Sequence, residues 1–227
     1  MKDPKILFED NHLLIINKPS GWLVQADKTG DTTLTDWARE YVKRKLNKPG
    51  DAFLHPTHRL DRPVSGVIVF ARTSKALERM NKLFREDQVQ KTYLAIVKDK
   101  PREMEETLIH HIEKDTIKNT VRAFTRSNKN TKQAELTYDV LAIGDSHSLV
   151  RVRPKTGRPH QIRVQMAKIE CPIKGDLRYG YPKANLDKSL NLHSFQIAFI
   201  HPVKQEELKI TCKPDWPDYK SFINDLD

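Results

Sequence analysis

Short apolar runs bounded by polar or turn-forming residues recur along the chain, and their length and β-branched content are typical of strands. The runs lie at residues 6–8, 13–17, 66–70, 91–97, 134–142, 148–153, 192–200 and 207–212, with a looser alternation over 106–124. Several neighbouring runs are separated by only a few polar residues, as Glu9-Asp10-Asn11-His12 separate the first two. Strands that follow one another so closely favour antiparallel pairing over repeated βαβ units.

Other segments show apolar residues every three or four positions, which is the spacing of amphipathic helices. These segments are 33–46, which Asp31 or Thr32 can cap, a segment that Thr73 or Ser74 can cap, 158–169, and a short one that begins near Pro217. In segment 158–169 Pro159 occupies the position of the first helical residue, and Ile162, Met166 and Ile169 form a stripe that we expect to be buried.

The pattern as a whole predicts a mixed α/β (α+β) fold with a mainly antiparallel central sheet flanked by helices. The 227 residues suffice for one large domain or for two closely packed sub-lobes. We find no internal repeat, low-complexity tract or linker in the sequence.

The composition of the chain is consistent with a polyanionic partner such as nucleic acid. The net charge is +10, and cations near phosphates raise affinity by releasing counterions, although a soluble basic protein can carry the same charge without binding nucleic acid.

Cys171 and Cys212 lie far apart without CxxC spacing, which argues for a reducing compartment and against a zinc ribbon or disulfides. His55 and His58 lack further ligands nearby, so we expect no metal. No segment reads as a membrane span or a cleavable leader, so the cytoplasm is the default expectation. Nothing in the sequence demands an oligomer, so we expect a monomer.

The stretch HRLDRPVSG, at residues 58–66, places Asp61 between two arginines just ahead of a strand. Pro63 and Gly66 predict an irregular turn, and loops held by rigid strands are where catalytic groups concentrate. The neighbouring cations favour the ionised carboxylate, which suits a nucleophile better than a proton donor. The local pattern fits equally well with a surface Asp–Arg pair that caps a turn.

The stretch KTGRPHQIR, at residues 155–163, is a second candidate. His160 and Arg163 are three positions apart, so a helix would present them on one face beside the turn at Gly157. Such a face can bind an anion, either a phosphate or the carboxylate of Asp61. The alternative is a solvated basic surface.

Tyr93 lies in the predicted strand KTYLAIV, where alternation places Lys91, Tyr93 and Ala95 on one face. A tyrosine in a strand is most often part of the core. Its functional interpretation is a ring that stacks on a base.

Together these stretches are similar to one known family. The chain resembles the RluA-type RNA pseudouridine synthases along nearly all its length, in ILFEDNHLLIINKPSGWLVQ, HRLDRPVSGVIVFARTSKAL, KTYLAIV, KTGRPHQIRVQMAKIECPIKGDLRYG and LHSFQIAFIHPV. The resemblance implies a single pseudouridine synthase catalytic domain over residues 1–227. Many relatives carry an N-terminal S4-type RNA-binding domain, which we do not find in this sequence, and the family often has His where this chain has Gln165.

The resemblance also implies a reaction and a set of roles. Family members convert a uridine in RNA, here rRNA or tRNA, to pseudouridine after flipping the nucleotide out, with no cofactor. Asp61 matches the essential acid, Arg163 the arginine that pairs with it, Tyr93 the residue that stacks on the uracil, and Arg59 the residue that fills the vacated space. We assign further RNA contacts to other residues of the two motifs, namely His58, Arg62, Lys155, Arg158 and His160.

Two other functions remain open at this point. A catalytically silent RNA-binding protein on the same scaffold would keep the basic surface, but it has no need of an isolated acid flanked by arginines. A hydrolase acting on a nucleoside or sugar would release free uracil, and a glycosidase needs two cooperating carboxylates where only Asp61 stands out.

Overall fold

The chain divides into two compact units in the computed structural model, which describes residues 2–47, 50, 52–115 and 120–224. Unit 1 consists of Met1–Gln90 and Ser194–Lys213, and unit 2 consists of Lys91–His193 and Pro214–Asp227. Whether the two units work as the single catalytic domain that we expect stays a prediction.

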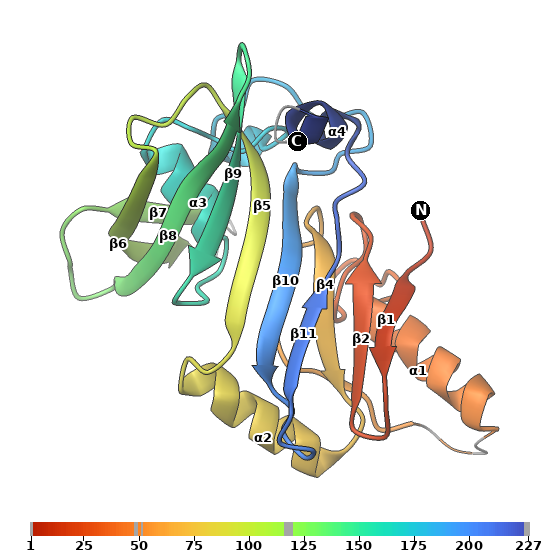
Figure 1. Cartoon of the computed structure of the whole chain (residues 1–227). Helices are drawn as coiled ribbons and strands as arrows, with labels where there is room; N and C mark the ends of the chain where they lie inside the picture. Colours follow the sequence, from red (N-terminus) through yellow and green to blue (C-terminus); the bar gives the residue numbers. More distant parts are fainter. Residues whose placement is uncertain (1, 48–49, 51, 116–119, 225–227) are drawn as a thin grey trace. The chain divides into compact units, whose positions relative to one another are not determined.

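Unit 1 is built on strands that follow the apolar runs of the sequence (Figure 1). They are β1 (Lys5–Glu9), β2 (Leu13–Lys18), β3 (His55–Pro56), β4 (Ser65–Ala71), most of β10 (Leu192–Ile200) and β11 (Glu207–Thr211). The order is β1-β2-β4-β10, with β3 paired to β4 and β11 to β10. β2 pairs antiparallel with β4 in a register that places Lys18 opposite Gly66.

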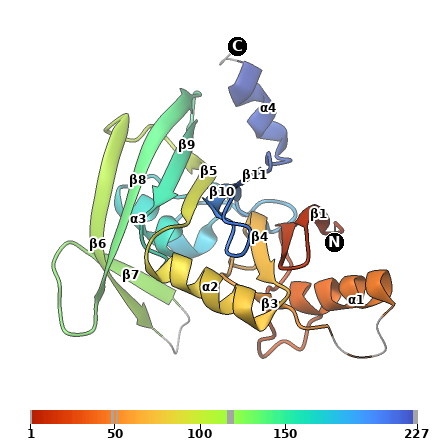
Figure 2. The same cartoon turned by 60° about the horizontal axis from the view of Figure 1, so that its bottom comes forward.

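The core of unit 1 forms where α2 (Ser74–Arg85) packs on this sheet (Figure 2). Leu13 and Ile15 of β2 and Val67 and Val69 of β4 are fully buried there, beside Met80 of α2. The alternate residues of β2 and β4 are also fully buried, so both faces of these strands are covered. The uninterrupted apolar runs of the sequence are the signature of that arrangement.

The capping residue of α1 (Leu34–Leu46) differs from the two predicted from the sequence, whereas that of α2 is one of the two predicted. Thr33, not Asp31 or Thr32, caps α1, because its side chain accepts from the Asp36 backbone while the Asp36 carboxylate accepts from the Thr33 backbone. Thr73 caps α2, as expected.

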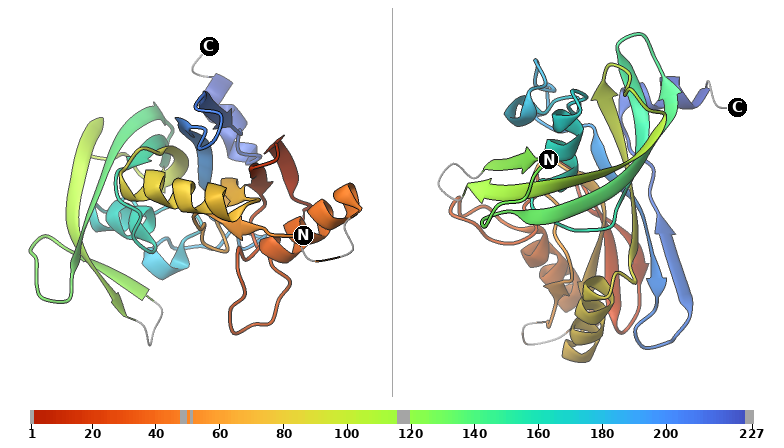
Figure 3. Two further views of the ribbon diagram at one scale, coloured as in Figure 1. Left: turned by 90° about the horizontal axis from the view of Figure 1, so that it is seen from below. Right: turned by 90° about the vertical axis from the view of Figure 1, so that its left-hand side faces the viewer.

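The strands of unit 2 follow one another in the sheet in the order β5-β9-β8-β6-β7, and the pairs β5–β9, β9–β8, β8–β6 and β6–β7 are antiparallel. These strands are β5 (Gln90–Lys98), β6 (Glu105–Asp115), β7 (Thr120–Phe124), β8 (Lys132–Ile143) and β9 (His147–Pro154). β6 and β8 run side by side over most of their length (Figure 3). The β8–β9 hairpin turns at residues 144–146, between the apolar runs 134–142 and 148–153 of the sequence.

Helix α3 (Gln161–Lys168) packs on this sheet, with Val164 against Ile112, Val121 and Ala134. The prediction that it begins at Pro159 is wrong. His160 adopts a left-handed conformation with φ of 51°, which an α-helix cannot contain, so the helix begins at Gln161. Unit 2 also contains the 3-10 helix η1 (Leu177–Tyr179) and α4 (Pro217–Asn224).

The mixed α/β fold with a mainly antiparallel sheet is therefore confirmed. None of the helices in the described part of the chain combines the length and apolar composition that a bilayer crossing requires. Among the same residues, no three His, Cys, Asp or Glu side chains gather closely enough to bind a metal ion.

Candidate active site

Asp61 begins a tight turn that leads directly into β4. The amide of Val64 donates to the carbonyl oxygen of Asp61 over 3.0 Å, which closes the turn three residues later. The Asp61 side chain is half-buried, whereas the β4 residues that follow are fully buried. The acid is therefore presented at the end of a rigid strand, as the sequence predicts.

Lys18 holds this turn against the end of β2. Its ammonium group is fully buried and donates to the carbonyl oxygens of Pro19 at 3.2 Å, Trp22 at 2.8 Å and Arg62 at 3.1 Å. An ammonium group has three donors, so these three carbonyls satisfy it completely. The amide of Gly21 also donates to Arg62 O, over 2.8 Å. The segment after β2 and the Asp61 turn thus form one hydrogen-bonded body.

The charge of Lys18 is coupled to that of Asp61. Burial lowers the pKa of Lys18 to about 7, and the negative charge of Asp61 acts in the opposite direction by favouring the ammonium form. The sequence did not identify Lys18 as a neighbour of Asp61. A lysine at the end of the apolar run LLIINK is the signal that could have indicated a buried, partnered cation.

The residues on either side of Asp61 have separate partners. The Arg62 guanidinium donates to Gly21 O over 3.1 Å and pairs with Asp31 at 2.8 Å, so its charge is shared with a carboxylate other than Asp61. The His58 ring packs against Phe84, and its Nε2 atom accepts from the Val69 amide over 3.1 Å. Arg59 is exposed.

Gly66 lets β4 approach β10 more closely than any other residue would. It has φ of 114°, and a Cβ atom at this position would lie 2.3 Å from the carbonyl oxygen of Ser194. The Ser194 hydroxyl donates to the neighbouring Val67 carbonyl over 3.0 Å. The glycine of HRLDRPVSG therefore fixes the strand that carries the turn.

Arg163 of unit 2 is buried in a bidentate ion pair with Asp176. Its Nε atom donates to Asp176 Oδ2 over 2.7 Å and its Nη2 atom to Oδ1 over 2.9 Å, and the two residues are 5% and 1% exposed. Arg163 is thus no part of a solvated basic face, which removes that alternative for this residue. The sequence did not single out Asp176 as a partner of Arg163.

Tyr179 completes the surroundings of Arg163. The Arg163 Cζ atom lies 5.0 Å from the centroid of the Tyr179 ring. The Tyr179 hydroxyl accepts from the Val121 amide over 3.1 Å and lies 2.7 Å from His160 Nδ1. Burial raises the pKa of Tyr179, so its hydroxyl keeps its proton and can donate it to His160. His160 and Arg163 both contact Tyr179, but His160 precedes α3, so the two residues do not share a helix face as predicted.

The loop before α3 is tied to β8 by Gln161. The Gln161 side chain accepts from the Thr156 hydroxyl over 2.8 Å and from the Arg158 amide over 2.9 Å, and it donates to Glu135 O over 3.0 Å. Lys155 and Arg158 are exposed on this loop, where Lys155 pairs with Glu135 at 3.0 Å. These are the surface cations of the motif.

Tyr93 lies in β5, opposite Val152 of β9, and is half-buried. It shares unit 2 with Arg163, while Asp61 belongs to unit 1. Action of the three residues at one site is accordingly part of the proposal below.

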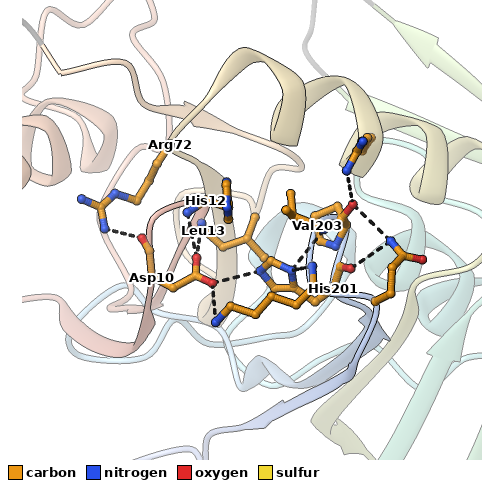
Figure 4. Close-up of polar contacts among 10 residues, drawn as sticks. Asp10, His12, Leu13, Arg72, His201 and Val203 are labelled. Carbon is orange, nitrogen blue, oxygen red and sulfur yellow. Dashed lines mark hydrogen bonds and ion pairs between the residues drawn. The ribbon is translucent and has the colours of Figure 1, made fainter.

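A separate polar cluster of unit 1 lies at the opposite end of β2 from Lys18 (Figure 4). His201 accepts on Nδ1 from the amides of Val203 and Lys204, and its Nε2 atom faces Asp10 Oδ2 at 3.1 Å. Asp10 also accepts from the amides of His12 and Leu13. The cluster joins the turn after β1 to the turn after β10.

Comparison with known proteins places this fold and these motifs in one family. A family model described as RNA pseudouridylate synthase matches residues 12–168. A ribosomal large subunit pseudouridine synthase C of Buchnera aphidicola is 37% identical, over 97% of this chain and 70% of its own. A tRNA pseudouridine synthase C of Haemophilus influenzae is 32% identical, over 93% of both chains. The solved structure titled Human RNA Pseudouridylate Synthase Domain Containing 4 has a TM-score of 0.77 and 29% identity, and the match covers 97% of this chain and 91% of that one. The chain belongs to the RNA pseudouridylate synthase family, in its RluA-type branch, whose members isomerise uridine to pseudouridine in RNA.

Proposed function

We propose that this isomerase converts specific uridines of rRNA or tRNA to pseudouridine, with Asp61 acting at the ribose of a flipped-out nucleotide. The observation that carries the assignment is the rigid turn at Asp61, which Lys18 and Gly21 hold through the Arg62 carbonyl. A nucleophilic carboxylate needs a fixed direction, and a turn with this many backbone contacts supplies one.

Base flipping is the second part of the proposal. The glycosidic bond of a stacked nucleotide is inaccessible, so the enzyme must extrude it at a cost of roughly a few kcal/mol. Arg59 is exposed and its planar guanidinium can stack in the vacated space. Tyr93 would stack on the extruded uracil and take part in proton transfer at its carbon.

Arg163 would pair with Asp61 during the reaction. A guanidinium has two edges that can each bind a carboxylate, and Asp176 binds the edge formed by Nε and Nη2. The edge formed by Nη1 and Nη2 is the one that we assign to Asp61.

Phosphates of the RNA would be contacted by His58, Arg62, Lys155, Arg158 and His160. The net charge of +10 supports a polyanionic substrate. Relatives are named for the ribosomal large subunit and for tRNA, and both RNA classes remain candidates for this chain. We expect the protein to act as a monomer in the cytoplasm without a cofactor, which light scattering and fractionation would check.

The deciding experiment incubates the purified protein, with no added metal or nucleotide, with total RNA that lacks modifications. Pseudouridine is then mapped by a chemical adduct that stops reverse transcription. We expect new stops that vanish with Asp61→Asn, which keeps the volume of the side chain, and persist with Asp145→Asn, which changes an exposed acid in a turn of unit 2. Tight RNA binding without stops would instead support a silent RNA-binding protein, and release of free uracil would support a hydrolase.

A further inference from the structure

Arg163 is constrained in two independent ways by residues of its own unit. Asp176 binds one edge of the guanidinium through two hydrogen bonds, which fixes its rotation within its plane. The ring of Tyr179, 5.0 Å from Cζ, lies over its face and fixes the tilt of the plane. A long, flexible side chain is thereby left with one direction for its second edge.

The two constraining residues are themselves fixed. The Tyr179 hydroxyl is held between the Val121 amide and His160 Nδ1. The Asp176 amide donates to Ile173 O over 3.0 Å, and its carbonyl accepts from the amides of Tyr179 and Tyr181. The preceding Gly175 has φ of 88°, and a Cβ atom there would lie 2.7 Å from Ser189 O.

The turn that carries Asp176 is also anchored to the strand that carries Tyr93. Ile173 bridges Val97 of β5, and the amide of Lys174 donates to Ile96 O over 2.9 Å. The support behind Arg163 and the strand of Tyr93 are therefore parts of one hydrogen-bonded structure within unit 2.

Stability alone does not account for such a pair. Buried ion pairs are often matched or exceeded in stability by well-packed apolar side chains, so their stabilising value is small. Helix α3 is buried from Gln161 to Met166, and an apolar residue at position 163 would suit that environment. The Arg163 guanidinium is instead charged and is held at one edge by Asp176 and at its face by Tyr179. Such support is typical of functional groups whose direction matters for their activity.

We infer that Asp176 is a positioning residue for Arg163, which aims the second guanidinium edge at the reacting group, with Tyr179 as its support. The inference rests on the proposed function of Arg163. It assigns Asp176 no contact with the RNA, so loss of Asp176 should lower turnover while leaving RNA affinity unchanged.

The test measures kcat, KM and RNA affinity for Asp176→Asn, which keeps the shape of the side chain but removes its charge and one acceptor. We expect kcat to fall on the order of 10- to 100-fold, as for other errors of orientation at a reacting group, with the RNA dissociation constant unchanged. The control is Asp139→Asn, which changes a less buried carboxylate of the same unit that pairs with Arg151, at 3.1 and 2.7 Å, and with Arg153. That control should leave kcat unchanged.

A double-mutant cycle distinguishes positioning from an independent role. If Asp176 acts through Arg163, then Asp176→Asn should change kcat by less than about threefold once Arg163→Lys is present. The NMR signal of the Arg163 Nε–H group gives a readout without turnover, and we expect it to shift in Asp176→Asn and not in Asp139→Asn.

The outcomes separate the two proposals. A folded Asp176→Asn protein with wild-type kcat would overturn the inference and leave the isomerase intact, whereas a wild-type protein that makes no pseudouridine would remove both. If Asp176→Asn does not fold, Asp176→Glu keeps the buried charge and displaces the carboxylate. A folded Glu variant should then show the same loss of kcat, and full turnover in it would contradict the inference.

Discussion

The buried ammonium group of Lys18 donates a hydrogen bond to the carbonyl oxygen of Arg62, the residue that follows Asp61, over 3.1 Å. This contact joins the end of β2 to the turn at the start of β4, and it is one of three that the same nitrogen makes.

Lys18→Met should destabilise the protein because it removes the Lys18 donor from the carbonyls of Pro19 and Trp22 and one of the two donors to the Arg62 carbonyl. We expect a loss of about 2–4 kcal/mol in the free energy of unfolding at pH 7, measured by urea denaturation. The exposed Lys75→Met is the control, with an expected change below about 0.5 kcal/mol.

The loss in Lys18→Met should also grow with pH. Burial lowers the pKa of Lys18 from 10.5 to about 7 in the folded protein, so between these values the unfolded chain binds more protons. The wild type therefore gains stability as pH rises through this window, by up to about 1.4 kcal/mol per pH unit, and the variant lacks that gain. A difference that stayed constant between pH 7 and 9 would contradict the assigned pKa.

Gly66→Ala should lower the stability of the protein much more than an alanine that replaces a glycine with no neighbouring atoms. Its Cβ atom would lie 2.3 Å from Ser194 O at a φ of 114°, and we expect a cost of about 3 kcal/mol or more. Gly30→Ala is the matched control, since Gly30 has φ of 73° but no atom within 4 Å of the added carbon. Equal melting temperatures for the two variants would show that the close approach to Ser194 does not matter.

His201 should make the fold less stable in acid. Burial lowers its pKa below the ordinary 6.5; the charges of Lys204 and His12 act in the same direction and that of Asp10 opposes them. As pH falls through 6.5 the unfolded chain takes up a proton that the folded protein resists, so stability is lost. His201→Gln should be less stable than wild type at pH 7.5, and this gap should narrow at pH 5.5 in urea denaturation. A gap that widened would reverse the sign that we assign.

Tyr93→Phe tests the two roles that we propose for this residue. The ring remains available for stacking, so RNA affinity should be unchanged, while loss of the hydroxyl should lower kcat by about 100-fold or more if it transfers a proton. Single-turnover kinetics and a binding assay would separate the effects, and full turnover would limit Tyr93 to stacking.

Arg59→Ala should lower kcat/KM if Arg59 fills the space that a flipped-out nucleotide leaves, as we propose. The experiment compares RNA binding and turnover with those of Lys75→Met, a lysine on the exposed side of α2. Unchanged binding and turnover in Arg59→Ala would contradict the role.

The sequence predicts the strands well because their signal is local. Runs such as LLII and GVIVF are buried on both faces, and a strand buried in this way shows in the sequence as an uninterrupted stretch of apolar residues. The Asp61 turn is similarly predictable, since proline and glycine restrict the backbone at nearby positions. The start of α3 was missed because the left-handed conformation of His160 and the side-chain contacts of Gln161 have no such local signal.

The partners of the candidate residues could not be predicted in the same way. Arg163 and its partner Asp176 are thirteen residues apart in the sequence, and Lys18 and Arg62 are forty-four apart. Both contacts therefore depend on tertiary structure. Asp176 lies in a turn that its own backbone closes through hydrogen bonds with Ile173 and Tyr181, and its carboxylate also binds an arginine on another element.

If Asp61 acts as we propose, the long separation between Lys18 and Arg62 makes catalytic competence a late event in folding. Contacts between distant parts of a chain form after local ones, because the entropy of closing the intervening loop must be overcome first. Until β2 and β4 pair, Lys18 has no carbonyl of the Asp61 turn to bind, and the carboxylate has no fixed direction. A nascent or partly folded chain could therefore hold RNA through its surface cations without modifying it, so modification would report that the polypeptide has reached its native state.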